Sequence, residues 1–233
     1  LEQATEFKEF IDNNPGVNIY KAERAGKTCY FIEGEVPDLN RFHYRLYNEY
    51  GIDSLSTSKN MEWYNDTLSV FWYWAPKFAK YIEKEKDIEF KVADAQDWLA
   101  FPAGFIAQDE LEIPLNCRIH SGEYGRSLGD PDFNQAPIQI ETAALSFADY
   151  IQGVSISESM FQINNLMPFK KKIDDRVKED KGDNWKEYQK YRNNKITSFL
   201  LYETAEELVL LKDIIGGMPN GIELEEWDEV SQE

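Results

Sequence analysis

Residues 68–74, with the sequence LSVFWYW, constrain the fold more than any other stretch of the chain. Four of these seven residues are aromatic and none is charged. A segment with no polar side has to be buried on all sides, because large apolar side chains favour burial. A short apolar run that stops at a proline, here Pro76, is typical of a strand buried on both faces of a sheet. We therefore predict a hairpin over residues 58–76, turning at Asn65–Asp66, with its second strand in the centre of a sheet.

The other segments alternate between helix and strand signals. Apolar residues at helical spacing predict a helix over residues 5–14, and Pro15–Gly16 ends it. Residues 17–34 predict a hairpin that turns at Ala25–Gly26, and a helix follows over residues 37–51. The same patterns predict helices over 76–87, 141–153, 157–167 (stopped before Pro168), 170–195 (broken near Gly182) and 204–217 (ended by Gly216–Gly217), and strands over 88–94, 105–108, 115–120, 196–203 and 221–227.

Residues 98–137 give the strongest loop signal in the chain. This stretch contains four prolines and four glycines, the two residue types that most often interrupt regular structure. Long ordered loops often carry binding or catalytic side chains. We therefore expect a functional site, if the chain has one of this kind, within this stretch.

Together these elements predict an α+β fold, with a mixed, mostly antiparallel sheet and helices packed on it. A length of 233 residues fits one large domain or two small ones. The charged stretch after residue 168 is the plausible divider. It predicts a main α+β lobe over residues 1–168, and a charged helical segment with a small β-α-β element over residues 169–233. One continuous domain is the alternative.

The charge of the chain is unevenly distributed. Its 43 acidic and 25 basic residues give a net charge of −18, and residues 203–233 hold ten acidic residues against one lysine. Residues 170–195 reverse this balance, with ten basic residues against six acidic ones. The two segments could neutralise each other, but complete pairing would still leave the chain anionic. Duplex DNA and anionic membranes are therefore poor direct partners.

The polar loop over residues 117–132 is the place where catalysis is most plausible. His120, Arg126 and Asp130 are side chains of the kinds that move protons and hold substrates in hydrolases. The chain contains no G-x-S-x-G elbow, P-loop or dinucleotide-binding glycine pattern to support a particular reaction. A hydrolase-like enzyme with its site in this loop is accordingly an alternative hypothesis.

A metal site finds little support in the sequence. Cys117 and His120 are three residues apart, and Cys29 with His43 could supply the other half of a zinc site. The spacing of Cys29 and His43 fits no compact metal motif. We expect no metal and no cofactor, and we expect the two cysteines to be reduced.

The C-terminal stretch IELEEWDEVSQE places one tryptophan among six acidic residues. Tryptophan is common at interface hot spots, and complementary charge accelerates association with a basic partner. The predicted partner-binding residues are the acidic residues and the tryptophan near the end of the chain: Glu223, Glu225, Glu226, Trp227, Asp228 and Glu229.

Moderate size, acidity and the lack of a catalytic motif are combined in proteins that shield a bacterium from a nuclease-type toxin. The leading hypothesis is therefore an acidic soluble binding protein, like an immunity protein, that neutralises a basic protein partner such as a toxin. Residues 145–153, LSFADYIQG, are similar to the closing helix of one immunity superfamily, although nine residues assign no family. A mimic of nucleic-acid charge that occupies a basic groove is a further alternative.

The expected location is the cytoplasm. No window approaches the ~18 apolar residues of a membrane span, and no basic-then-apolar leader is present. A signal peptide removed before residue 1 stays an open alternative, because the first residue is Leu1. The sequence does not set the oligomeric state.

Overall fold

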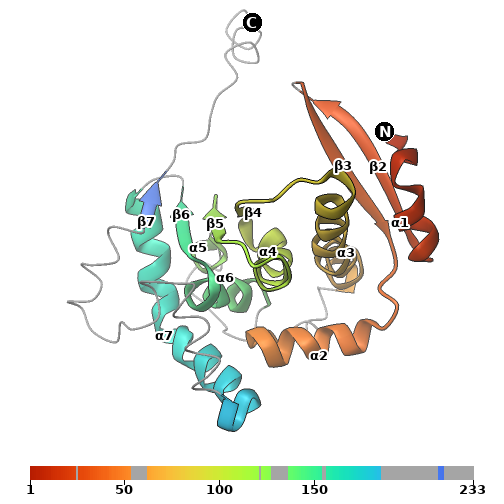
Figure 1. The fold of residues 1–233 in the computed structure, drawn as a ribbon. Helices are drawn as coiled ribbons and strands as arrows, with labels where there is room; N and C mark the ends of the chain where they lie inside the picture. The colour runs from red at the N-terminus through yellow and green to blue at the C-terminus, as the bar shows by residue number, and fades with distance from the viewer. Residues whose placement is uncertain are drawn as a thin grey trace, which may run out of the picture.

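A computed structural model describes residues 1–24, 26–53, 62–120, 122–126, 136–153, 156–184 and 215–217, apart from the side chains of residues 62–66, 125–126, 156–160 and 215–217. These residues form two sheets and a set of helices, so the predicted α+β class is confirmed. Figure 1 shows an antiparallel hairpin at one end of the molecule, a parallel sheet toward the other, and helix α3 between them.

The N-terminal sheet follows its predicted hairpin. Its antiparallel strands occur in the order β1 (Glu2–Gln3), β2 (Val17–Arg24) and β3 (Lys27–Gly34), with Ile19 opposite Ile32. The helix predicted ahead of this hairpin is present as a 3-10 turn, Thr5–Phe7, followed by α1 (Lys8–Asn13). Phe7 and Phe10 of this segment pack on the sheet in a small core.

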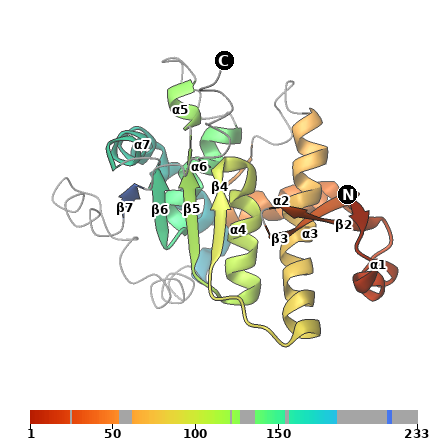
Figure 2. The same cartoon turned by 90° about the horizontal axis from the view of Figure 1, so that it is seen from above.

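The second sheet contains the strands β4 (Ala93–Gln96), β5 (Leu115–Ile119), β6 (Tyr150–Gly153) and β7 (Ile215–Gly217), all parallel and in chain order. The expectation of a mostly antiparallel sheet is therefore wrong for this part of the fold. Three helices lie in the crossovers: α4 (Asp97–Leu111), α6 (Ala136–Phe147) and α7 (Ile156–Lys181), with the short α5 (Glu123–Arg126) before α6. Figure 2 shows β6, β5 and β4 side by side, followed by α4 and α3.

The crossover helices form one layer, because α6 packs against both α4 and α7. Right-handed crossovers between strands in chain order place their helices on the same face of a sheet. β5 reflects this arrangement: Leu115, Cys117 and Ile119 are buried, whereas Asn116 and Arg118 alternate with them and are only half-buried. One face of the parallel sheet is thus apolar and the other polar.

Helix α2 (Leu39–Tyr50) matches its prediction closely. The Asp38 carboxylate accepts the backbone N–H of Arg41 at 3.0 Å and caps the first turn. Gly51 ends the helix at φ 72°, a left-handed conformation that glycine adopts without strain. Its buried residues, Phe42, Leu46 and Tyr50, follow helical spacing.

The prediction for residues 58–76 is wrong, because residues 62–86 form one long helix, α3 (Glu62–Lys86). Two hydrophobic cores bury two sides of this helix, while Phe71 stays 38% exposed. Trp72 is 0% exposed in the larger core, whereas Trp74 packs in the smaller one with the N-terminal sheet. The indole N–H of Trp72 donates to the Leu99 carbonyl at 2.7 Å, and that of Trp74 to the Glu35 carbonyl at 2.9 Å.

Two predictions for the middle of the chain are also wrong. The strand predicted over residues 88–94 begins to pair only at Ala93. The alternating apolar residues at 88–92 therefore do not form the buried face of a strand. Residues 98–111, expected as loop with a strand at 105–108, belong to α4. Burial of α4 against the sheet outweighs the backbone hydrogen bond that Pro102 cannot make. The strand predicted over 115–120 is confirmed by β5.

The helix predicted over residues 141–153 ends at Phe147, and residues 150–153 form strand β6. The likeness of residues 145–153 to a closing helix therefore has no structural basis. Helix α7 continues through Pro168, where a stop was expected, and ends near Gly182 as predicted. Residues 215–217 are a strand instead of the end of a helix.

Helix α7 crosses the proposed boundary at residue 168, and its Ile173 and Val177 join the larger core. The division into two lobes stays a prediction. The strands predicted over 196–203 and 221–227, and residues 204–214 of the last predicted helix, lie outside the described residues. No helix in the described part of the chain combines the length and apolar character needed to cross a membrane.

The helical assignment of residues 68–74 makes a prediction about two neighbouring aromatic residues. Trp72→Ala should lower the free energy of unfolding by about 3–5 kcal/mol, because it empties a fully buried site. Phe71→Ala is the matched control, with an expected loss below about 1.5 kcal/mol, since Phe71 is 38% exposed on the same helix. Urea unfolding followed by circular dichroism measures both. Equal, large losses would indicate the central strand instead.

Candidate functional site

The carboxyl ends of β4 and β5 bring several polar groups together at one edge of the parallel sheet. Ligands of open parallel sheets usually bind outside this edge. β4 ends at Gln96 and β5 at Ile119, so Asp97 and His120, the residues that follow, lie next to each other. The backbone N–H of His120 donates to the Asp97 carboxylate at 2.7 Å.

Hydrogen bonds fix the imidazole of His120. The side-chain amide N–H of Gln96 donates to Asp94 at 2.8 Å, which leaves the Gln96 carbonyl oxygen directed at the ring. That oxygen lies 2.7 Å from Nε2 of His120. Because a carbonyl oxygen only accepts, Nε2 carries the proton and Nδ1 of the neutral ring holds the lone pair. A histidine oriented in this way can serve as a base.

The same polar chain continues across the open face of the sheet. Asp94 also accepts the side-chain N–H of Asn116 at 2.6 Å and lies 3.6 Å from Arg118. These residues face each other in the β4–β5 register, where Asp94 pairs with Asn116 and Gln96 with Arg118. The position of the His120 ring therefore depends on a network anchored in two strands.

Asp97 occupies an unusual backbone conformation. Its φ of 55° lies in the left-handed region, which a non-glycine residue adopts rarely and at some cost. This conformation lies at the junction of β4 and α4. Asp97 is thereby held where its carboxylate binds the backbone at His120. Strain of this kind is often found at functional sites.

Glu141 is a buried acid on the adjacent helix α6, and its side chain is 0% exposed. Its carboxylate accepts the backbone N–H of Glu123 at 2.9 and 3.0 Å and so holds the start of α5. Burial raises the pKa of Glu141 to about 8, against the lowering effect of that bond, and the charges of Glu123 and Asp97 add to the rise. The group therefore changes its charge near neutral pH.

Glu123 and Trp98 close the other side of this edge. The indole N–H of Trp98 donates to the Glu123 carboxylate at 3.1 Å, which links the first turn of α4 to the start of α5.

Cys117, on β5, is fully buried, and burial raises the pKa of its thiol. It is therefore a poor nucleophile. The described residues contain no group of three or more His, Cys, Asp or Glu placed to hold a metal ion.

The structure describes only part of the sites predicted from sequence. His120 lies at the edge just outlined. Arg126 ends α5, but its side chain lies outside the description, as does the whole of Asp130. The predicted partner-binding residues also lie outside the described residues: Glu223, Glu225, Glu226, Trp227, Asp228 and Glu229.

Sequence reasoning missed Gln96, Asp97 and Glu141, whereas Glu123 lies in the loop over residues 117–132 that was predicted as the place for catalysis. The first two were hidden because β4 was predicted a few residues too early. Glu141 had a usable signal, since it is the only acidic residue between Ala136 and Ala148 in an otherwise mostly apolar segment. Comparison of the chain with models of protein families and with curated proteins found no match.

The raised pKa of Glu141 predicts a pH-dependent stability. Between about pH 4.5 and 8 the folded state keeps a proton that the unfolded state has released, so the free energy of unfolding falls as pH rises. The loss from this group is on the order of 4 kcal/mol across that window. Glu141→Gln should flatten the dependence and be more stable than the wild type at pH 8.

Urea unfolding at pH 5, 6.5 and 8 measures this effect. The exposed Glu9→Gln provides the control and should retain the wild-type slope. If Glu141→Gln also retains that slope, Glu141 is ionised in the folded protein at neutral pH and the assignment fails.

Proposed function

We propose that this chain is an acidic cytoplasmic binding protein that neutralises a basic protein partner, in the manner of a bacterial immunity protein acting on a toxin. Its proposed contact surface consists of the acidic residues and the tryptophan near the C-terminus: Glu223, Glu225, Glu226, Trp227, Asp228 and Glu229. In this proposal Trp227 supplies apolar contact area, and the carboxylates supply attraction and a fast association rate. The partner is a protein, with no direct role for DNA or a membrane.

The observation that carries the proposal is how the cations of α7 are used. These were the groups most able to neutralise the C-terminal carboxylates within the chain. Arg176 instead lies 2.8 Å from the Asp53 carboxylate and donates to the Gly51 carbonyl, also at 2.8 Å. Lys170 pairs with Asp174 in the same helix. Arg176 and Lys170 are thereby committed to other groups, whereas Lys171 and Lys178 of the same helix are exposed. The engagement of Arg176 and Lys170 favours a C-terminal charge excess that is left for a partner.

The charge of the whole chain supports the same function. A net charge of −18 attracts basic proteins over a distance of about one screening length and speeds their encounter. Such an interaction weakens strongly as salt rises. A mimic of nucleic-acid charge is a version of this proposal in which the partner's basic groove is its own nucleic-acid site.

The experiment uses the basic proteins encoded by the genes next to the one for this chain. Each is expressed alone and with the chain, and growth is recorded. We expect one of them to arrest growth, the chain to restore growth, and the purified pair to form a salt-sensitive complex. Neutralising Glu225, Glu226, Asp228 and Glu229 together should weaken the complex about 10-fold or more, since each exposed charge pair is worth roughly 0.2–1 kcal/mol.

A control variant with the same change in net charge tests whether the affinity depends on the position of the carboxylates or only on the total charge of the chain. It replaces four exposed glutamates of the described part with glutamine: Glu9, Glu35, Glu85 and Glu179. This control should change the dissociation constant by less than about 3-fold, because most of the attraction is local. Equal weakening by both variants would overturn the proposed contact surface. If no neighbouring basic protein binds, the proposed function fails.

Hydrolysis at the carboxyl edge of the parallel sheet is a second candidate function. One observation favours it: the side-chain oxygen of Gln96 accepts a hydrogen bond from Nε2 of His120 and so fixes the orientation of the ring. In this reading Nδ1 of His120 accepts a proton from an attacking water, and the buried acid Glu141, whose pKa is about 8, holds the start of α5 beside the site.

Simple chromogenic esters and phosphodiesters test this candidate. His120→Ala should lower the rate by ~100-fold or more without changing the melting temperature, because a positioned base contributes about 10²–10⁴-fold. His43→Ala is the control, since His43 lies on α2 and bonds Ser69 at 2.8 Å instead. Absence of turnover in the wild type, or equal rates in the two variants, would exclude the site for these substrates.

A further inference from the structure

A pocket of about 640 Å³ lies between α2, α3 and the end of α7. Its volume is within the range of small-molecule sites in proteins. The three helices contribute charged and aromatic side chains to its wall. The cations among the lining residues come from all three helices: Arg41 and Arg45 from α2, Lys77 from α3 and Lys181 from α7.

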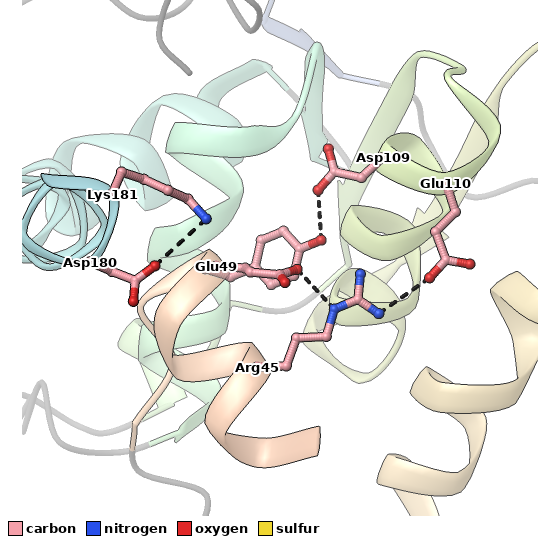
Figure 3. Close-up of polar contacts among 7 residues, drawn as sticks. Arg45, Glu49, Asp109, Glu110, Asp180 and Lys181 are labelled. Carbon is pink, nitrogen blue, oxygen red and sulfur yellow. Dashed lines mark hydrogen bonds and ion pairs between the residues drawn. The ribbon is translucent and has the colours of Figure 1, made fainter. Parts of the chain in front are cut away.

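The acidic residues of the wall already have partners. The Asp38 carboxylate caps α2 by accepting the backbone N–H of Arg41 at 3.0 Å. Glu49 accepts from Nε of Arg45 at 2.8 Å, and Asp180 lies 3.6 Å from Lys181. Figure 3 shows the Glu49–Arg45 and Asp180–Lys181 pairs, with the Arg45 guanidinium held between Glu49 and Glu110.

Arg45 and its neighbours form a structural network. Arg45 Nη1 donates to the Glu110 carboxylate at 3.2 Å, which ties α2 to α4. The Tyr50 hydroxyl donates to Asp109 at 2.7 Å, a second link between the same helices. The charge of Arg45 is therefore used in holding the fold together, and it contributes little to a ligand.

Arg41 and Lys77 differ from Arg45 in their lack of a carboxylate partner. Within the described residues neither side chain has a carboxylate partner, and both line this one pocket. The ammonium group of Lys77 lies 4.7 Å from the centre of the Tyr73 ring, which also lines the pocket. Other described cations, such as Lys80 and Lys84, also lack a carboxylate partner, but Arg41 and Lys77 are brought together in one pocket.

We propose that this pocket binds a small phosphorylated molecule. A phosphate group carries close to two negative charges at neutral pH, which matches one guanidinium and one ammonium group. The planar fork of Arg41 can donate two hydrogen bonds to phosphate oxygens, and Lys77 adds a point charge. Because the acidic residues of the wall are engaged, they offer less repulsion to the phosphate than free carboxylates would.

The aromatic residues of the wall define the rest of the ligand. Tyr44 lines the pocket, stacks on Tyr47 with ring centroids 6.3 Å apart, and is 64% exposed, so much of its ring is accessible to a ligand. Tyr73 lies beside Lys77 and offers a second apolar surface. A molecule with a ring attached to its phosphate, such as a nucleoside monophosphate, uses both the cations and the rings. This site is separate from the proposed partner surface, and either can fail without the other.

Calorimetric titration at fixed ionic strength tests the site on the full chain. The probes are inorganic phosphate, adenosine monophosphate and adenosine. We expect adenosine monophosphate to bind more tightly than phosphate, and adenosine to bind weakest. The double substitution Arg41→Gln with Lys77→Gln should weaken binding of the monophosphate about 30-fold or more, since hydrogen bonds to charged groups are among the strongest.

Lys80→Gln with Lys84→Gln is the matched control. Both lysines are exposed on α3, neither lines the pocket, and the change in net charge is the same. This control should change the dissociation constant by less than about 2-fold. Equal weakening by both double variants would show nonspecific attraction and overturn the site. Failure of every probe to bind at about 10 mM would do the same.

Tyr44→Ala tests whether the ligand carries a ring, as adenosine monophosphate does, or is inorganic phosphate alone. If a ring is part of the ligand, this variant should weaken adenosine monophosphate several-fold and leave inorganic phosphate unchanged, because stacking on a tyrosine is worth about 1–3 kcal/mol. If it leaves both probes unchanged while the Arg41 and Lys77 variant loses both, the pocket takes the phosphate group alone, and the ring part of the proposal is wrong.

Discussion

The fold depends on one helix, α3, that is buried on two sides. Trp72 packs in the core shared with α2, α4 and α6, whereas Val70, Trp74 and Phe78 pack in the core under the N-terminal sheet. The two indole N–H groups each find a backbone carbonyl, so burial leaves neither donor unpaired. The two cores meet at this helix and at Val36, which packs against both, so α3 couples the hairpin to the parallel sheet.

The chain order of the parallel strands explains where polar groups gather. Sequential right-handed crossovers place α4, α6 and α7 in one layer, so the opposite face of the sheet can carry polar side chains. Asp94, Asn116 and Arg118 occupy that face and bond one another. The network ends at His120 on the carboxyl edge. An apolar residue at any of these positions would remove a support for the imidazole.

The sequence predicted well those elements whose ends carry local signals. Helix α2 has its capping aspartate and its closing glycine, and the N-terminal hairpin has alternating apolar residues. Residues 68–74 were misread because an apolar run without polar positions has no period, and only tertiary context decides between strand and helix. His120 was found because it is one of two histidines, whereas Glu141 was hidden among 43 acidic residues until its burial became known.

Scarcity of positive charge is the second constraint on this molecule. With 25 basic residues against 43 acidic ones, there are more than enough carboxylates to pair with every cation, and the described structure uses two arginines to join helices. Arg45 joins α2 to α4, and Arg176 joins α7 to the end of α2. Pairing of this kind stabilises modestly, and it also removes those cations from any neutralisation of distant carboxylates. The acidic excess itself follows from the composition of the chain. Arg41 and Lys77, which have no carboxylate partner among the described residues, differ from other such cations in lining the same pocket.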